Sequence, residues 1–542
     1  MSALEKEVQV RNEKTTSKGV SSNSSSQLER RQSQELVLGF MGAVGCGLPA
    51  VITKCESLLR KLGYTVVRIK LSDFIRERWV DTRPHASGNK DEARYLTYQT
   101  GGNELRMSYG TEIHAEYAIN RIQRHRLAVD GETLDMQKEV PQIAYLIDQI
   151  KHPDEARLLR LVYRRLFYLI GVMSTSEHRK SRLTDEGWEV DAEKIMMRDR
   201  KESEEYGQQL EKAFKLADYF VQHPLGDGNY LEGELNRFLS LVHGHNGITP
   251  TKHEHAMYMA HTTALKSGCL SRQVGAAITD KMGNLIAVGT NDVPKYGGGL
   301  YDADRGPEND MRCFSHGKKC ENVEQKLLRK ARIQNGLETL IKSFPDGSEK
   351  EFLAGKVGEI LDVAYKNSGL PDLIEFSRAV HAEMDAIVSV ARGGGGSTVG
   401  ANLYTTTFPC HNCARHIIAA GIERVYYIEP YDKSLALQSH KDAIVMLDHE
   451  GDQAGAGKEM VKFIHFAGVA PNMYSTLFLR DGGRKGHEGE VVEYANLDGE
   501  APRKIVKEFL DSYRAFETKV SSIFDENFPP EQAPEKGLKV VN

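Results

Sequence analysis

The sequence has few cysteines, no long apolar run and no excess of positive charge. Seven cysteines in 542 residues are too sparse for the disulfide scaffold of a small secreted domain. No apolar run approaches the length of about 20 residues that spans a bilayer, and the polar start of the chain lacks the apolar region of a secretory signal. The net charge of −5 gives no overall attraction to nucleic acid or an anionic membrane. We therefore expect a cytoplasmic protein that does not engage a membrane.

The chain length predicts two or three domains, because single cores rarely grow beyond about 250–300 residues. Residues 1–34 are rich in serine and charged side chains, which predicts a disordered tail. Alternating strands and helices are expected over 35–235 and again over 250–485. A polar insertion at about 300–372 interrupts the second pattern, and 486–542 is expected to form a helical extension and tail.

Apolar segments bounded by turn residues predict the individual elements. In the first pattern, the order strand–helix–strand with a crossover predicts a parallel sheet. Strands are expected at 36–40, 64–69, 144–147, 166–172, 275–279, 285–289, 402–406 and 425–428. Helices are expected at 49–62, 196–220, 255–267 and 410–420.

A glycine-rich turn follows the first strand, where a phosphate-binding loop would lie. Gly42, Gly45 and Gly47 supply its glycines, and backbone N–H groups at the start of a helix attract anions. The motif G-x-x-x-x-G-K-[ST] also needs Lys and Ser or Thr, but Leu48 and Pro49 stand there. This degenerate loop argues against an active kinase. The first domain either binds a nucleotide and senses a signal or only supports its neighbour.

Two short motifs in the C-terminal half have the residues and spacing of a catalytic zinc site. His381 and Glu383 form H-x-E, and Pro409, Cys410 and Cys413 form P-C-x-x-C, the pattern of zinc-dependent nucleobase deaminases. Two thiolates three residues apart at the start of a helix share one face, and an imidazole supplies a third ligand. The fourth position stays open for water, whose pKa zinc lowers towards neutrality.

Glu383 is expected to carry protons rather than to bind zinc. It would take a proton from the attacking water and deliver protons to the ring nitrogen and the departing ammonia. H-x-E alone occurs often by chance, and C-x-x-C alone could be a redox pair or half of a structural zinc site. Both motifs occur here in the required order, joined by a predicted helix, loop and strand, which favours the catalytic interpretation.

Three further segments strengthen a family resemblance. They are Ser271–Ala276, Gly289–Pro294 and Thr405–Cys410. On these segments and the zinc motifs, the region from His253 to Tyr431 resembles the deoxycytidylate deaminase branch of the cytidine deaminase-like fold. The resemblance implies that Asn291 contacts deoxyribose and that Arg272 meets phosphate. Without the resemblance, Asn291 would be an ordinary turn former and Arg272 a surface cation.

The whole chain, from Leu36 to about Phe478, is similar to the bacterial anti-phage deoxycytidine nucleotide deaminases. The resemblance implies an α/β fold with a P-loop-kinase-like parallel α/β domain followed by a cytidine deaminase-like α/β/α domain. It implies zinc-dependent deamination of free deoxycytidine nucleotides, dCTP and also dCMP, which would deplete dCTP during phage infection. A homo-oligomer is expected. Because uncontrolled loss of dCTP would be toxic, an inhibitory RNA or protein is an expected partner.

Two other functions could use the same motifs. A polynucleotide deaminase acting on single-stranded DNA or tRNA needs a basic stripe and aromatic stacking platforms, and no Arg- and Trp-rich run follows Cys413. A binding protein derived from a deaminase would have no catalytic role, but the motif residues are intact.

The polar insertion contains its own candidate sites. Cys313, His316 and Cys320 could hold a second, structural zinc only with a fourth ligand from elsewhere, and such clusters in polar insertions are more often incidental. The basic run Lys326–Arg332 either forms a solvated helical face or attracts nucleotide phosphates.

Overall fold

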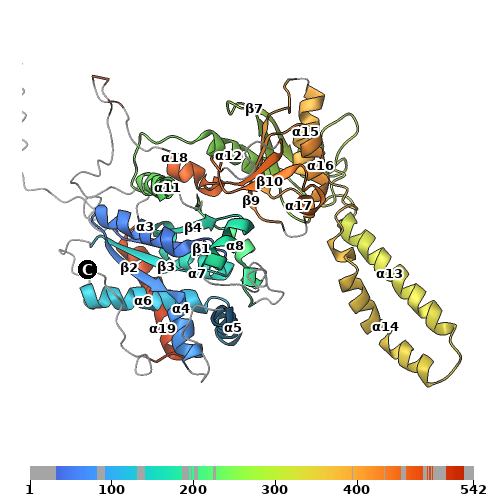
Figure 1. The fold of residues 1–542 in the computed structure, drawn as a ribbon, viewed down its shortest axis with the longest axis horizontal. Helices are drawn as coiled ribbons and strands as arrows, with labels where there is room; N and C mark the ends of the chain where they lie inside the picture. Colours follow the sequence, from blue (N-terminus) through green and yellow to red (C-terminus); the bar gives the residue numbers. More distant parts are fainter. Residues whose placement is uncertain are drawn as a thin grey trace, which may run out of the picture.

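The computed structural model of the chain contains two α/β halves and a helical hairpin that projects from the second half (Figure 1). It describes residues 32–81, 92–130, 141–185, 195–196, 198–199, 206–223, 228–393, 395–431, 434–452, 459–479, 485, 488–489, 491 and 508–529. Most of the expected tail, residues 1–34, lies outside the described residues. Its last three residues correct that boundary, since Gln32 forms a β-bridge with Phe509 and Ser33 is buried.

The first sheet has six strands in the order β12-β5-β4-β1-β3-β2. Its strands are β1 (Leu36–Gly42), β2 (Thr65–Lys70), β3 (Ile143–Asp148), β4 (Phe167–Met173), β5 (Tyr219–Gln222) and β12 (Gly468–Val469). β1 through β5 are parallel, as the crossover pattern predicts. Every residue of β1 is buried, because a central parallel strand is covered by helices on both faces.

Helices cover both faces of the first sheet (Figure 1). One face packs against α3 (Leu48–Lys61) and α11 (Gly228–Val242). The opposite face packs against α4 (Leu71–Ile75), α6 (Ile113–Asp130), α7 (Pro153–Tyr163), α10 (Leu210–Phe214) and α19 (Leu510–Asn527). Two more helices, α5 (Glu92–Tyr109) and α8 (Ser176–Asp185), lie near the edge where the parallel strands end.

The helix expected over 196–220 is wrong at its C-terminal end. Only α10 is helical between residues 206 and 218, and the next four residues form β5. The reason is pairing with β4, in which Tyr219 and Phe220 lie beside Ile170 and Gly171. All four residues of β5 are buried, so the edge of the sheet determines the conformation of this apolar segment.

The second sheet also has six strands, in the order β10-β11-β9-β8-β6-β7. They are β6 (Gly275–Thr279), β7 (Leu285–Thr290), β8 (Asn402–Thr407), β9 (Arg424–Glu429), β10 (Ile444–Leu447) and β11 (Val461–His465). β6 is antiparallel to both β7 and β8, and the remaining pairs are parallel. The four strands that the sequence predicts in this half are confirmed.

The helices of the second half divide between the two faces of its sheet. α12 (Lys252–Ala264) packs on the face that shares a hydrophobic cluster with the first half. The opposite face packs against α15 (Ala382–Gly393), α16 (His411–Ala419) and α17 (Ala436–Ser439). Short turns of helix occur at Arg76–Val80, Arg164–Leu166, Ala303–Arg305, Leu370–Asp372 and Pro471–Met473, the last followed by α18 (Tyr474–Phe478).

The expected polar insertion at about 300–372 contains two long antiparallel helices. They are α13 (Glu321–Lys342) and α14 (Ser348–Asn367), which project from the second half as a hairpin (Figure 1). Lys330 on α13 pairs with Asp362 on α14, with 2.8 Å between Nζ and Oδ1. The hairpin starts beside the second sheet, so its first turns can contribute to a site there.

Segments from the C-terminal part of the chain return to the first half. β12 pairs antiparallel with β5, although it lies within the segment 250–485 expected to form the deaminase-like domain. α19, in the expected extension 486–542, packs along α6. The two halves therefore share a sheet and a hydrophobic core.

Among the helices of the described residues, none is both long and apolar enough to cross a membrane.

A buried ion cluster joins the two ends of the described chain. Arg126 on α6 is 4 % exposed and donates to both carboxylate oxygens of Glu35, at 3.0 and 2.6 Å. Arg126 also contacts the carboxylate of Glu517 on α19. Beside Arg126, the pKa of Glu35 is lowered in spite of burial, which by itself raises it. The cluster keeps three ionisable groups out of water by pairing them.

We predict that Arg126→Met destabilises the protein strongly. Removing one partner of a buried ion pair leaves uncompensated charge and costs about 3–5 kcal/mol. Arg124→Met is the matched control, because Arg124 pairs with Asp525 at 2.7 Å where both side chains are about one-third exposed, and such pairs contribute about 0–1 kcal/mol. Urea unfolding followed by circular dichroism measures both. Equal losses for the two variants would contradict the prediction.

Candidate metal centre and active site

Three side chains predicted as zinc ligands meet at one point of the second half. The ligand atoms of His381, Cys410 and Cys413 all lie within 4.8 Å of one another. His381 Nδ1 is 3.3 Å from Cys410 Sγ and 3.3 Å from Cys413 Sγ. This is the one group of three or more His, Cys, Asp or Glu side chains with metal-binding geometry among the described residues.

Two helix starts on the same face of the second sheet bring these ligands together. Cys410 is the N-cap of α16, and its Sγ accepts a hydrogen bond from the backbone N–H of Cys413 at 3.4 Å. His381 immediately precedes α15. The N-terminal end of a helix carries partial positive charge, which favours thiolates over thiols.

The packing of α15 depends on a glycine in β7. A Cβ atom on Gly289 would lie 2.2 Å from Ala382 O and 2.3 Å from Ala386 N, so a larger residue would push the helix away. The backbone N–H of Thr290 also donates to Asp385 Oδ2 at 3.1 Å. These contacts fix the start of α15, and with it His381 and Glu383, against the sheet.

The donor set fits zinc. Two sulfur ligands and one imidazole nitrogen are typical of zinc sites. Tetrahedral zinc, with Zn–S about 2.3 Å and Zn–N about 2.0 Å, would hold nitrogen and sulfur about 3.5 Å apart. The distances of 3.3 Å between His381 Nδ1 and the two Sγ atoms are close to that value. Three protein ligands leave a fourth position for a reacting group, as in catalytic zinc sites.

Glu383 lies beside this centre. It is 4 % exposed, and its Oε2 is 3.4 Å from Cys413 Sγ. Burial raises the pKa of its carboxyl, because a low-dielectric environment disfavours the charged form. Glu383 therefore lies next to the predicted ligands, and its expected role as a proton carrier stays a prediction.

A cavity of about 290 Å³ opens onto the centre. Its lining includes His381, Glu383 and Cys410 together with both predicted substrate residues, Asn291 and Arg272. Of the six residues predicted for the zinc and substrate site, the structure therefore brings five to one cavity. Cys413 is fully buried behind it.

Asn291 holds the loop that forms one wall of the cavity. Its side-chain oxygen accepts from the backbone N–H of Val274 at 2.7 Å, and its side-chain nitrogen donates to Arg272 O at 2.8 Å. An amide nitrogen carries two N–H groups, so Asn291 can hold the loop and still offer a donor. Arg272 itself is exposed, with its guanidinium carbon 5.3 Å from the ring centroid of Tyr431.

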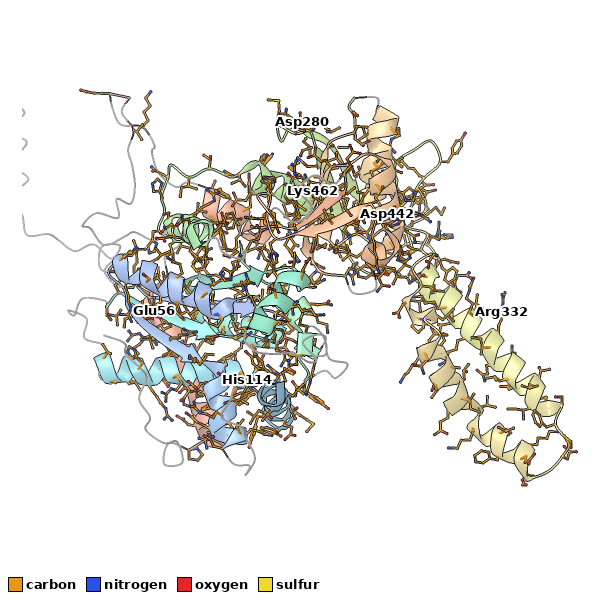
Figure 2. The ribbon with its side chains drawn as sticks, in the orientation of Figure 1. Glu56, His114, Asp280, Arg332, Asp442 and Lys462 are labelled. Atoms are coloured by element: carbon orange, nitrogen blue, oxygen red, sulfur yellow. The ribbon has the colours of Figure 1, made fainter. Side chains whose placement is uncertain are left out.

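The projecting hairpin also contributes to the cavity. Asn322 and Lys326 on α13 are part of the lining, and Lys326 Nζ donates to Pro371 O at 2.7 Å. Within the basic run Lys326–Arg332, Lys326 therefore reaches the cavity, whereas Arg332 is exposed further along α13 (Figure 2). Sequence reasoning missed Asn322 and Tyr431, because no motif surrounds either residue.

The structure does not bring Cys313, His316 and Cys320 together as a metal group within the described residues. The Sγ of Cys320 instead lies 3.8 Å from Ser271 Oγ. The second zinc site that the sequence left open thus gains no support from the geometry.

In the first half, side chains of the same chain contact the backbone of the degenerate glycine loop, where a phosphate would otherwise bind. The backbone N–H of Val44, which a phosphate could otherwise take, donates to Asp199 Oδ2 at 2.7 Å. Asp199 also pairs with Lys151 at 2.6 Å, and Lys151 Nζ donates to Gly42 O at 3.0 Å.

The other two glycines of this loop, Gly45 and Gly47, have φ of 80° and 79°, a conformation that favours glycine. The ring of His223 packs so closely on Gly47 that a Cβ there would lie 2.1 Å from Nδ1.

The fold and the His/Cys/Cys centre define the class of protein, an α/β deaminase. The family model of the cytidine and deoxycytidylate deaminase zinc-binding region matches residues 250–429. The chain is 30 % identical over 180 residues to the deoxycytidylate deaminase of Enterobacteria phage T4, covering 33 % of this chain and 78 % of that protein. The chain therefore belongs to the cytidine and deoxycytidylate deaminase family.

Two further similarities accompany this match. The deoxycytidylate deaminase of Enterobacteria phage T2 is 28 % identical over 181 residues, 33 % of this chain and 80 % of that protein. The solved dCMP deaminase from the cyanophage S-TIM5 in complex with dCMP and dUMP is 17 % identical, with a TM-score of 0.22. That similarity covers 40 % of this chain and 99 % of the solved one.

We predict that Cys413→Ser removes about one zinc ion per chain, because three ligands suffice for a catalytic zinc and two do not. Cys313→Ser is the matched control and is expected to keep the zinc content of the parent protein. Elemental analysis of purified protein by mass spectrometry measures both. Loss of zinc from the Cys313→Ser variant would show that the insertion holds metal after all.

Proposed function

We propose that this deaminase hydrolyses the exocyclic amino group of free deoxycytidine nucleotides, dCTP as well as dCMP, in a zinc-dependent reaction. The observation that carries the proposal is the buried carboxyl of Glu383 beside the centre, inside a cavity that also contains Asn291. The products would be the deoxyuridine nucleotide and ammonia.

Each residue of the site would have its own role in the reaction. His381, Cys410 and Cys413 would hold zinc, which when bound supplies the Lewis acidity that activates water for attack at C4 of cytosine. Glu383 would take a proton from that water and pass it to N3 of the ring as the C4–O bond forms, and would then take the second proton from the hydroxyl at C4 and deliver it to the departing amino group. The C4–N bond breaks as this hydroxyl becomes a carbonyl, so water and the amine give a carbonyl and ammonia.

Asn291 would orient the sugar. Its second amide N–H can donate to a hydroxyl of deoxyribose while the first continues to hold the loop at Arg272. A donor that is fixed by its own hydrogen bonds loses little conformational freedom when the substrate binds, and this improves positioning.

Two cations that line the cavity support a triphosphate substrate. Arg272 and Lys326 come from different elements but line the same cavity. Both side chains are donors that pair with phosphate oxygens. Two separate cations can engage more phosphate groups than one, which favours dCTP.

We predict that Glu383→Gln lowers kcat for dCTP by about 10²–10⁴-fold, the usual contribution of general acid–base catalysis, while zinc content stays unchanged. Ammonia release from dCTP, dCMP, CTP, cytidine and single-stranded DNA measures activity. The parent protein is expected to act on the deoxycytidine nucleotides. Activity on the oligonucleotide alone would favour the alternative, a polynucleotide deaminase.

We predict that Lys326→Ala raises KM for dCTP by about tenfold, because one charge-assisted phosphate contact is lost. KM for dCMP should change less, since its single phosphate can pair with Arg272. Lys330→Ala is the matched control on the same helix, where Lys330 pairs with Asp362. Steady-state kinetics on both substrates tests the prediction. Equal effects on dCTP and dCMP would argue against a contact with the outer phosphates.

For the first half, we propose a P-loop-kinase-like fold that has lost phosphoryl transfer. The central position of β1 and the glycine loop that follows it support the likeness. The contacts of Asp199 and His223 with the loop at Gly42, Gly45 and Gly47 favour a supporting role over phosphate binding. Depletion of dCTP as anti-phage defence, a homo-oligomer and an inhibitory RNA or protein partner follow from the family resemblance and belong to the same proposal.

A further inference from the structure

A buried aspartate, Asp292, connects the substrate side of the candidate site with its metal side. It directly follows Asn291 and is 2 % exposed. Its backbone carbonyl accepts from the N–H of Val380 at 3.0 Å, as part of a β-bridge between the two residues. Val380 immediately precedes His381, so the position of this metal ligand depends on where the backbone of Asp292 lies.

His381 is fixed along the chain on both of its sides. On the C-terminal side, its carbonyl accepts from the backbone N–H of Asp385 at 2.9 Å, in the first turn of α15. On the N-terminal side, the bridge from Val380 to Asp292 holds the segment that enters the helix. Between these two points the imidazole has to reach both cysteine ligands, and an error of about 1 Å in such a site can cost about a hundredfold in rate.

The side chain of Asp292 is held by two other segments of the second half. Its Oδ2 accepts from the backbone N–H of Gly268, just after α12, at 2.8 Å. The Nη1 of Arg312, in the polar insertion, lies 3.9 Å from the same oxygen. Arg312 lies so close to the backbone of Gly268 that a Cβ atom there would be 3.2 Å from Nη1. The insertion is therefore packed against the turn that carries Asp292.

Arg312 is fixed in turn by a second carboxylate of the insertion. Its Nε and Nη2 donate to the two carboxylate oxygens of Asp310, both at 2.8 Å, the bidentate geometry that gives a guanidinium a defined direction. Ser315 Oγ donates to Asp310 Oδ2 at 2.6 Å. Asp310, Arg312 and Asp292 form a row of alternating charge, which we call the Arg312 network.

Stability alone does not explain the Arg312 network. Taking charges out of water costs free energy that their attraction offsets only in part, and apolar side chains of similar volume are often at least as stable. A bidentate ion pair supplies a fixed geometry instead. The residues that line the cavity at His381 do not include the three members of the network, so within the described chain its effect on the site is indirect, through the backbone.

We propose that Arg312 is a positioning residue of the deaminase site. Through Asp292 it fixes the turn that holds Val380, and it thereby places the imidazole of His381 for metal binding. This gives the first part of the polar insertion a role that no motif connects with the metal centre. The inference rests on the zinc-dependent reaction proposed above, because it concerns the same centre.

Cobalt substitution of the full-length protein tests the proposal, because the visible absorption of Co²⁺ reports the geometry of its ligands. Titration of the metal-free protein with Co²⁺ gives both the spectrum and the dissociation constant. Arg312→Gln is expected to change the spectrum and to raise the dissociation constant about tenfold, the lower end of the effect of removing groups that orient metal ligands. The kcat for dCTP should fall by a similar factor.

Lys295→Gln is the matched control for loss of a cation in this region. Lys295 pairs with Asp302 at 3.1 Å, and its side chain is 19 % exposed, close to the 15 % of Arg312. This variant should keep the cobalt spectrum and the dissociation constant of the parent. Asp292→Asn should reproduce the effect of Arg312→Gln, and the double variant should be no worse than either single variant, because Arg312 acts through Asp292.

Circular dichroism checks that each variant is folded. Arg312→Lys, which keeps a cation beside the two carboxylates, is a milder change that tests the proposal if Arg312→Gln does not fold, and it should alter the cobalt spectrum in the same direction by a smaller amount. The proposal is overturned if the folded Arg312 variants have the spectrum and the dissociation constant of the parent. It is also overturned if the effects of Arg312→Gln and Asp292→Asn add in full, or if Lys295→Gln causes the same change. A parent protein that has an intact cobalt centre but does not deaminate dCTP would count against the proposed function alone.

Discussion

The candidate site depends on the close approach of α15 to β7, which Gly289 permits. Even a methyl group there would overlap the backbone of Ala382 and Ala386, and side chains cannot be compressed at such distances. A displaced α15 would carry His381 and Glu383 away from the two cysteines, which are fixed independently at the start of α16. The metal centre thus requires a small residue in a neighbouring strand as much as it requires its own ligands.

The same strand end connects the centre to substrate binding. Asn291 follows β7 directly, two residues after Gly289, and its amide holds the backbone of Arg272 and Val274. One short segment therefore positions α15 and shapes the wall of the cavity. Groups held on packed strands and helices keep their geometry better than groups on loops, which suits a reaction that depends on accurate placement of a proton carrier.

The sequence predicts the residues of the centre because each motif is local: His381 and Glu383 lie in H-x-E, and Cys410 and Cys413 lie in C-x-x-C. Most strands are also predicted, since their apolar runs are continuous. Contacts between distant segments are not predictable in this way. β12 joins β5 across more than two hundred residues of sequence, and Asn322 reaches the cavity only because the insertion folds back beside it. Neither feature has a local pattern, because pairing and packing with distant partners determine it.

α12 is one of the elements through which the two halves meet. A Cβ on Gly275 of β6 would lie 1.9 Å from Ala260 O, so α12 is held tightly to the second sheet. Glu254 on the same helix accepts from the backbone N–H of Val469 in β12 at 2.9 Å and pairs with Arg237 of α11 at 2.6 Å. Since α12 contacts both sheets, a shift of the first half would act on β6 and then on its neighbour β8, whose end leads to Cys410. A ligand bound in the first half could change deamination only if it favoured one position of such a packed element over another.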